Sequence, residues 1–235
     1  MTLLKFMRKV LKIPIQKQLK PDDYLQKQIP VFDEIENFIQ DFFPENNKQL
    51  SVAAFRWFEE WRNWKELQVL EAPNSWNASS GLSISLYMLV RLVKPSLVVE
   101  TGTANGASAA AISAALEANN KGVLHTFDVY DFDLSLVPIH SRTRIVKHRI
   151  KRRNSLAVWM RDNHALIDSS SIFLHDSNHS YEHQKWEYSL AKRFGFSWIL
   201  SDDVDDSQAF IEILDGRKSV LVDGDKLIGF FNSGN

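Results

Sequence analysis

The sequence contains no cysteine. This absence excludes disulfide frameworks, cysteine-ligated zinc and thiol nucleophiles, and it fits a reducing compartment such as the cytoplasm. An excess of one charge is also missing, because 28 basic residues face 29 acidic ones and leave a formal net charge of -1. Nucleic-acid binding depends on a strong positive field, so the balance argues against a nucleic-acid partner.

Long hydrophobic runs are absent from the N-terminal segment. Lys5, Arg8, Lys9 and Lys12 interrupt its apolar residues, so the segment predicts neither a signal peptide nor a membrane-spanning helix. The apolar residues of 1–13 recur at helical spacing and predict an amphipathic basic helix. Such a helix packs on its own domain or on a second copy in a homodimer, or it lies on the inner membrane surface as a peripheral contact. Packing against protein is the favoured interpretation.

Two regions differ in pattern. Residues 1–80 predict a helical extension, because prolines cut the segment into short pieces around an aromatic-rich helix at 51–70. Trp57, Trp61 and Trp64 share one face of that helix. Such a face is more typical of a core or interface than of a surface that stacks on a sugar or aromatic ligand. Residues 81–235 alternate short apolar runs with amphipathic segments and predict an α/β domain.

The alternation indicates a doubly wound, mostly parallel sheet with helices on both faces. Asp223-Gly224-Asp225, between two apolar runs, predicts a C-terminal antiparallel hairpin at or near one edge. The predicted strands are 96–100, 122–128, part of 144–150, 171–175, 196–201, 219–222 and 227–231, and the predicted helices are 83–93, 107–118, 155–163, 181–193 and 207–214.

A glycine-containing turn follows the first of these strands. Gly102 and Gly106 stand in a G-x-x-x-G spacing that leads directly into a helix, and glycine lets the backbone turn sharply beside a ligand. A dinucleotide site requires G-x-G-x-x-G, so an NAD-dependent oxidoreductase is disfavoured. Glu100, two positions before Gly102, would repel a pyrophosphate but suits a cofactor that carries an ammonium and a sulfonium. Asp128 ends the next strand, where a carboxylate can accept hydrogen bonds from ribose hydroxyls.

VVETGTANGASA followed by LHTFD resembles the first motif and the second-strand acidic residue of class I S-adenosylmethionine (SAM)-dependent methyltransferases. The resemblance implies a Rossmann-like α/β fold and SAM as cofactor. It implies that Gly102 and Gly106 shape the methionine side of the site and that Thr103 also binds the cofactor. Glu100 would orient the amino end of the cofactor, and Asp128 would hold the ribose.

Three further carboxylates follow neighbouring strands. Asp176 comes after one predicted strand, and Asp202 with Asp203 after the next, so the strand ends can bring them together. We call these three residues the acidic cluster. Three oxygen ligands suit Mg²⁺, Mn²⁺ or Ca²⁺. Helix capping is the competing interpretation for the pair, and it is the better one for Asp205 and Asp206.

The segment from His175 onwards resembles a bacterial branch of the methyltransferases with a His-Asp-Ser-x-His-x-Tyr signature, and more distantly the metal-dependent catechol and sugar O-methyltransferases. That resemblance implies Asp176, Asp202 and Asp203 as metal ligands, with Asp176 also near the cofactor and in a catalytic role. His179 would be the general base. Asn178 departs from the pattern, because many relatives have a second aspartate there, and this weakens the metal prediction.

The resulting hypothesis is transfer of a methyl group from SAM to a hydroxyl of a small acceptor, a sugar or glycan, a polyol or a phenol. Assistance by a divalent cation is part of the hypothesis. Two alternatives stay open: a metal-independent methyltransferase in which His179 works alone, and a non-catalytic binding module that keeps the fold. His175 is interpreted as structural, and packing explains Glu187 as well as a function does.

Overall fold

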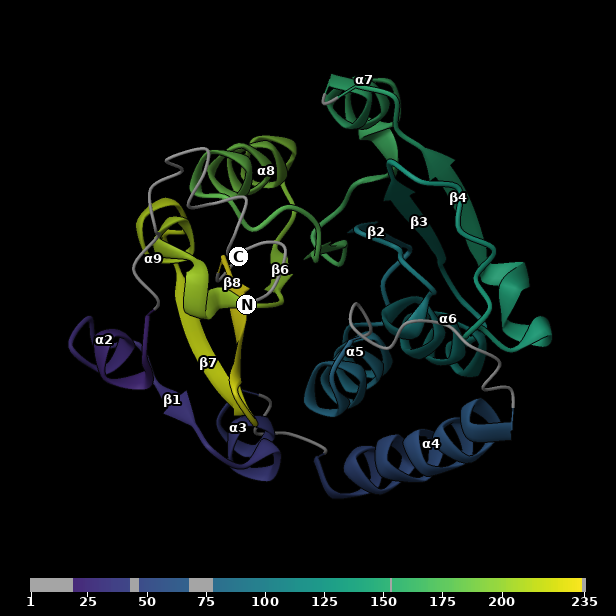
Figure 1. Cartoon of the computed structure of the whole chain (residues 1–235), viewed down its shortest axis with the longest axis horizontal. Coiled ribbons are helices and arrows are strands. Elements are labelled where there is room, and N and C mark those ends of the chain that lie inside the picture. The colour runs from purple at the N-terminus through teal and green to yellow at the C-terminus, as the bar shows by residue number, and fades with distance from the viewer. Residues whose placement is uncertain (1–18, 43–46, 68–77, 153, 234–235) are drawn as a thin grey trace, which may run out of the picture.

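A computed structural model describes residues 19–42, 47–67, 78–152 and 154–233 of the chain (Figure 1). The predicted helix at 1–13 lies outside these residues. The strands are β1 (Val31–Phe32), β2 (Leu97–Thr101), β3 (Val123–Asp128), β4 (Ile145–Arg149), β5 (Ile172–His175), β6 (Trp198–Ser201), β7 (Arg217–Asp223) and β8 (Lys226–Asn232). The helices are α2 (Pro21–Leu25), α3 (Ile35–Phe42), α4 (Asn47–Leu67), α5 (Ser80–Val93), α6 (Ala107–Asn119), α7 (Asn154–Asp162), α8 (Tyr181–Phe194) and α9 (Gln208–Ile213).

The eight strands of the described residues belong to one sheet, in the order β1-β7-β8-β6-β5-β2-β3-β4. Neighbouring strands are parallel except where β8 pairs with β6 and with β7. The predicted doubly wound, mostly parallel sheet with a C-terminal antiparallel hairpin is therefore confirmed. The chain winds outward from β2 in one direction and continues from β5 in the other. In open α/β sheets, ligands bind at the carboxyl ends of the strands beside such a reversal.

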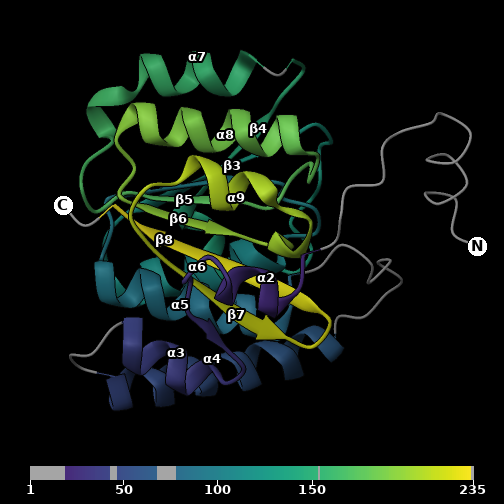
Figure 2. The ribbon, with the colours of Figure 1, turned by 90° about the vertical axis from the view of Figure 1, so that its left-hand side faces the viewer.

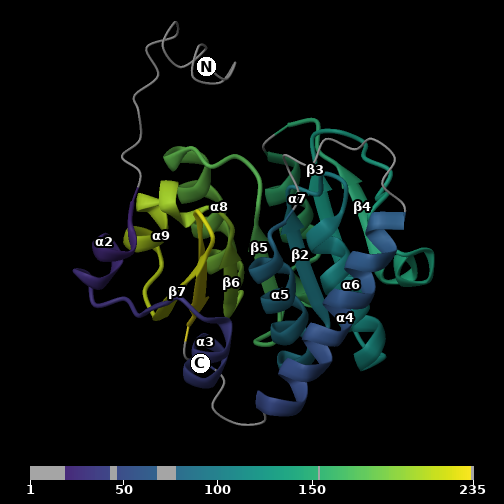
Figure 3. The ribbon, with the colours of Figure 1, turned by 60° about the horizontal axis from the view of Figure 1, so that its bottom comes forward.

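Helices cover both faces of the sheet, and the layers are visible edge-on in Figure 2. One face carries α7, α8 and α9, and its core contains Tyr188 and Phe210. The other carries α5 and α6, with α3 and α4 outside them. Figure 3 shows α4 running in front of this second layer. The described helices include none that is long and apolar enough to cross a membrane.

The aromatic face of α4 is part of the core. Trp57 stacks on Tyr87 of α5 with ring centroids 5.0 Å apart, and Trp61 is buried and donates its indole N–H to the carbonyl of Leu136 at 3.0 Å. Trp57 and Trp61 therefore have the packing role that their spacing favours. The side chain of Trp64 lies outside the described part. The predicted boundary at residue 80 stays a prediction, although β1, which precedes it, is a strand of the same sheet.

Candidate active site

The carboxyl ends of β2, β5 and β6 form one continuous edge of the sheet. Because these three strands are neighbours and parallel, the residues that directly follow them come next to one another. These residues are Gly102 after β2, Asp176 after β5 and Asp202 after β6. The peptide N–H of Asp202 donates to the carbonyl of His175 at 3.0 Å, which holds the last two strand ends together. The glycine turn thus lies beside the acidic cluster.

Gly102 permits this close approach. Its φ of +89° lies in the left-handed region, and a Cβ there would lie 1.8 Å from the carbonyl oxygen of Asp176. Gly106 has a φ of +88° and begins α6 directly after the turn. The backbone of β5 therefore runs against the turn at a distance that only glycine at position 102 allows.

Asp128, the last residue of β3, stabilises the turn through hydrogen bonds to its backbone. One of its oxygens, Oδ2, accepts from the peptide N–H groups of Thr103 at 2.8 Å and Ala104 at 3.2 Å. The other, Oδ1, accepts from the N–H of Tyr130 at 2.9 Å. A carboxylate offers about four acceptor positions, so capacity for ribose hydroxyls is left. Gly102, Thr103 and Asp128, all predicted on the cofactor side, are thus brought together.

Glu100 lies inside the domain, beneath the turn, and is fully buried. Its carboxylate accepts hydrogen bonds from the hydroxyl of Ser108 and from that of Thr126, the latter at 2.5 Å. Burial raises the pKa of Glu100 to about 7, even though these two hydrogen bonds act in the opposite direction. Both of its oxygens are engaged within the protein, so Glu100 supports the turn. Its contact with the amino end of a cofactor stays a prediction.

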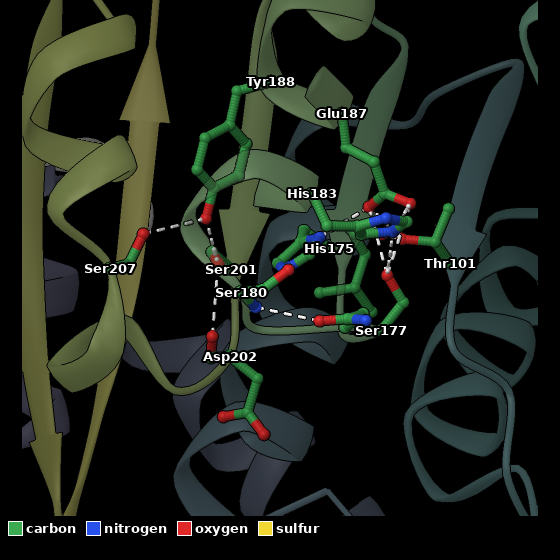
Figure 4. Close-up of polar contacts among 12 residues, drawn as sticks. Thr101, His175, Ser177, Ser180, His183, Glu187, Tyr188, Ser201, Asp202 and Ser207 are labelled. Atoms are coloured by element: carbon green, nitrogen blue, oxygen red, sulfur yellow. Dashed lines mark hydrogen bonds and ion pairs between the residues drawn. The ribbon is translucent and has the colours of Figure 1, made fainter. Parts of the chain in front are cut away.

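The acidic cluster is close enough for its members to perturb one another. Burial raises the pKa of Asp202 to about 6, and the charge of Asp203 adds to this. Burial also raises the pKa of Asp176 well above its usual range, and the negative charge of Asp202 is the second cause of this rise. Asp202 is 2% exposed. Figure 4 shows its side chain at the end of β6.

A lysine compensates these charges. The Nζ atom of Lys226, the first residue of β8, lies 3.2 Å from Oδ2 of Asp202 and 2.9 Å from Oδ1 of Asp203. A metal ion bound by these two oxygens would compete with Lys226 for them. Among the described residues, no three His, Cys, Asp or Glu side chains are arranged to hold a metal ion. As arranged, the predicted ligands Asp176, Asp202 and Asp203 do not fit a divalent cation.

His179 lies beside the acidic cluster, with its Nε2 3.9 Å from Oδ2 of Asp203. Burial lowers the pKa of His179 to about 4, and the charge of the neighbouring His175 acts in the same direction. The ring is therefore neutral at pH 7, the state in which a histidine can accept a proton.

A buried polar network centred on Glu187 connects the ends of β2 and β5 to α8 (Figure 4). Glu187 of α8 accepts from His175 Nδ1 at 2.5 Å and from the hydroxyl of Thr101 at 2.7 Å, and it lies 2.9 Å from His183 Nε2. Burial alone would raise the pKa of Glu187, but the charge and the hydrogen bond of His175 lower it to about 2. The network fixes the end of β5 to α8, and with it the loop that carries His179.

Comparisons with known proteins agree with this geometry. Residues 99–204 match the profile of a family described as a methyltransferase domain. Over these residues the chain is similar to a methyltransferase domain. A search of curated protein sequences finds no match.

The solved structures that share the fold of this chain include two O-methyltransferases. An O-methyltransferase from Bacillus cereus, in complex with S-adenosylhomocysteine (SAH), has 13% identity and a TM-score of 0.55, over 84% of this chain and 96% of its own. The O-methyltransferase TomG from Streptomyces achromogenes, involved in tomaymycin synthesis and in complex with SAM, has 14% identity and a TM-score of 0.52, over 86% and 97%. The prediction of a class I SAM-dependent methyltransferase is confirmed by the family match together with the fold.

Sequence interpretation missed one part of this site, Lys226. Lys226 follows the hairpin turn and gave no signal of its own, because its position depends on which hairpin strand lies beside β6. The structural interpretation of His175 agrees with its burial and with its hydrogen bond to Glu187. Glu187 lies on the buried face of α8, together with Gln184 and Tyr188.

Proposed function

We propose that the chain is an O-methyltransferase that moves the methyl group of SAM to a hydroxyl of a small acceptor. The observation that carries this proposal is the row of Gly102, Asp176 and Asp202 at adjacent strand ends. At one end of this row lies the glycine turn, on the cofactor side, and at the other end lies a neutral histidine, His179. A turn for the donor and a base for the acceptor at one sheet edge are what methyl transfer to oxygen needs.

The proposed chemistry is a single displacement. The acceptor oxygen attacks the methyl carbon of the sulfonium and forms the new O–C bond. The S–C bond breaks, and its electron pair goes to sulfur, which leaves neutral SAH. The proton of the acceptor hydroxyl passes to His179. No step is assigned to a metal ion.

The acceptor is proposed to be a sugar or glycan, a polyol or a phenol. The names of the Bacillus cereus and Streptomyces achromogenes proteins, both O-methyltransferases, support oxygen as the methylated atom. A cytoplasmic location, a homodimer and a membrane contact through residues 1–13 are left as proposals for separate tests.

The first experiment is calorimetric titration of the full chain with SAH. Wild type is expected to bind, and Asp128→Ala to bind about 10- to 100-fold more weakly, because hydrogen bonds to a charged group contribute about 1.5–3 kcal/mol. Asp133→Ala is the matched control. Asp133 is an exposed aspartate that accepts one backbone N–H, from Ser135 at 2.9 Å. Absence of SAH binding by wild type would reject the proposal in favour of a non-catalytic module.

The second experiment measures SAH release with a panel of hydroxylated acceptors. His179→Ala is expected to lower kcat about 10²- to 10⁴-fold, the usual contribution of a general base. His140→Ala, at an exposed histidine, serves as control. Unchanged turnover in His179→Ala, with a productive acceptor, would remove the base from the mechanism.

A further inference from the structure

Lys226 reaches the acidic cluster because of the sheet topology. β8 runs antiparallel to β6, and Gly229 pairs with Ser201, the last residue of β6. The start of β8 therefore extends past the end of β6, where Asp202 and Asp203 follow. The hairpin turn is held from the other side, because Gly81 of α5 donates its N–H to Asp223 at 2.7 Å.

The ammonium group is bound by both carboxylates of the pair. Asp202 contributes Oδ2 at 3.2 Å and Asp203 contributes Oδ1 at 2.9 Å. Asp202 is 2% exposed, and its second oxygen, Oδ1, is buried without a hydrogen-bond partner in the described part of the chain. A buried carboxylate beside a second one requires a nearby positive charge. Lys226 supplies it, and burial that would lower its pKa is outweighed by the charges of Asp202 and Asp203, which raise it.

A metal ion and Lys226 exclude each other at this position. Mg²⁺ binds carboxylate oxygens at about 2.0–2.1 Å, so an ion bonded to both of these oxygens would occupy the space of the ammonium group. Two like charges at such a separation repel strongly, and one of them has to leave.

His179 lies on the far side of the same carboxylate. Asp203 meets Lys226 through Oδ1, and its Oδ2 lies 3.9 Å from Nε2 of His179. The fixed cation and the neutral histidine therefore flank a single side chain. A positive charge near an acceptor hydroxyl stabilises the oxygen as it loses its proton, as a metal ion does.

We propose that Lys226 provides, in place of a divalent cation, the positive charge of the acidic cluster, and that it stabilises the acceptor oxygen beside His179. The charge assignment stands on the geometry of Lys226, Asp202 and Asp203. The second part, concerning the acceptor oxygen, rests on the proposed function. Lys226 would act on the acceptor through its charge, and the wild-type chain is expected to have no divalent-cation site at the acidic cluster.

The test uses Mn²⁺ alone as probe, with binding to the full chain followed by electron paramagnetic resonance of the free ion. Wild type is expected to show no site that depends on Asp202. Lys226→Ala vacates the position between two carboxylates and is expected to gain one Mn²⁺ site, at least 10-fold tighter than any wild-type binding. Adding Asp202→Asn to Lys226→Ala is expected to remove the gained site.

Lys192→Ala is the matched control. The side chains of Lys192 and Lys226 are both 35% exposed, but Lys192 pairs with a single carboxylate, Asp215, at 3.1 Å. It is expected to gain no site. Lys226→Gln, which keeps the stem of the side chain, is measured alongside in case Lys226→Ala fails to fold. Lys226→Arg keeps the charge and is expected to stay without a site.

Two results would overturn the inference. One is a wild-type Mn²⁺ site that Asp202→Asn abolishes, because the ion would then displace Lys226. The other is the absence of a gained site in both Lys226→Ala and Lys226→Gln. SAH titration of the same wild-type sample reports separately on the proposed function. A chain that binds neither SAH nor Mn²⁺ would reject the methyltransferase chemistry while the charge assignment of Lys226 still held.

Discussion

Replacing Gly102 with alanine should destabilise the chain far more than replacing Gly195, although both glycines have similar left-handed backbone angles, with φ of +89° and +84°. An alanine in that region costs about 1–2 kcal/mol of folding free energy. A Cβ at Gly195 meets nothing within 4 Å, so this cost is the whole effect there. At Gly102 the Cβ would lie 1.8 Å from the carbonyl oxygen of Asp176 and 2.5 Å from its carbonyl carbon.

The clash at Gly102 is with backbone, so no rotamer change relieves it, and β2 must separate from β5. Overpacking that forces backbone shifts costs about 1–3 kcal/mol or more. We therefore expect Gly102→Ala to lose about 3 kcal/mol more than Gly195→Ala. In a chain of this size the difference corresponds to about 6–12 °C in Tm.

Urea unfolding and thermal unfolding of both variants measure this difference. SAH titration is expected to show weaker binding in Gly102→Ala only, since Gly195 ends α8 and lies away from the cofactor turn. Equal losses of stability in the two variants would refute the argument, because the close contact between the turn and β5 would then have no energetic consequence.

Two further predictions concern buried glutamates. Glu187→Gln is expected to lose about 3 kcal/mol at pH 7, because the folded pKa of Glu187, about 2, lies below its ordinary 4.5. This stabilisation is present above pH 4.5 and declines as the pH falls towards 2. Urea unfolding at pH 7 and pH 3 should therefore show that Glu187→Gln loses less free energy of unfolding at pH 3. Glu182→Gln, at an exposed glutamate, is the control. For Glu100 the sign is opposite: the folded pKa, about 7, exceeds 4.5, so the unfolded chain ionises first and wild type loses stability as the pH rises from 4.5 to 7. Glu100→Gln lacks this loss and should gain about 3 kcal/mol relative to wild type between pH 4.5 and pH 8; a constant difference across that range would contradict the burial of an ionisable carboxyl.

Much of the fold could be predicted from the sequence, because buried parallel strands are short apolar runs. β2, β3, β5 and β6 lie within two residues of their predicted bounds. β1 was missed, since the two residues Val31 and Phe32 are too short to form a pattern. The order of the two hairpin strands was also beyond prediction. Both of its strands are largely buried, so their side chains do not indicate which of them pairs with β6.

The residues of the candidate site likewise differ in how far the sequence predicts them. Gly102, Gly106 and Asp128 were predictable because their spacing is local to one strand-turn-helix unit and the next strand. Lys226 pairs with residues more than twenty positions away, and only the order of β6, β8 and β7 brings it to them. Long-range ion pairs of this kind carry no period in the sequence.

The location of β8 has a consequence for how the chain folds as it is synthesised. β8 lies between β6 and β7, although it follows both in the sequence. Until residues 226–232 have left the ribosome, β6 and β7 each have an unpaired edge, and such edges pair readily with other chains. Before that point Asp202 and Asp203 lack their contact with Lys226, and the sheet is not yet continuous between β6 and β7. Chaperone binding is expected to be greatest at this stage and to end when β8 inserts.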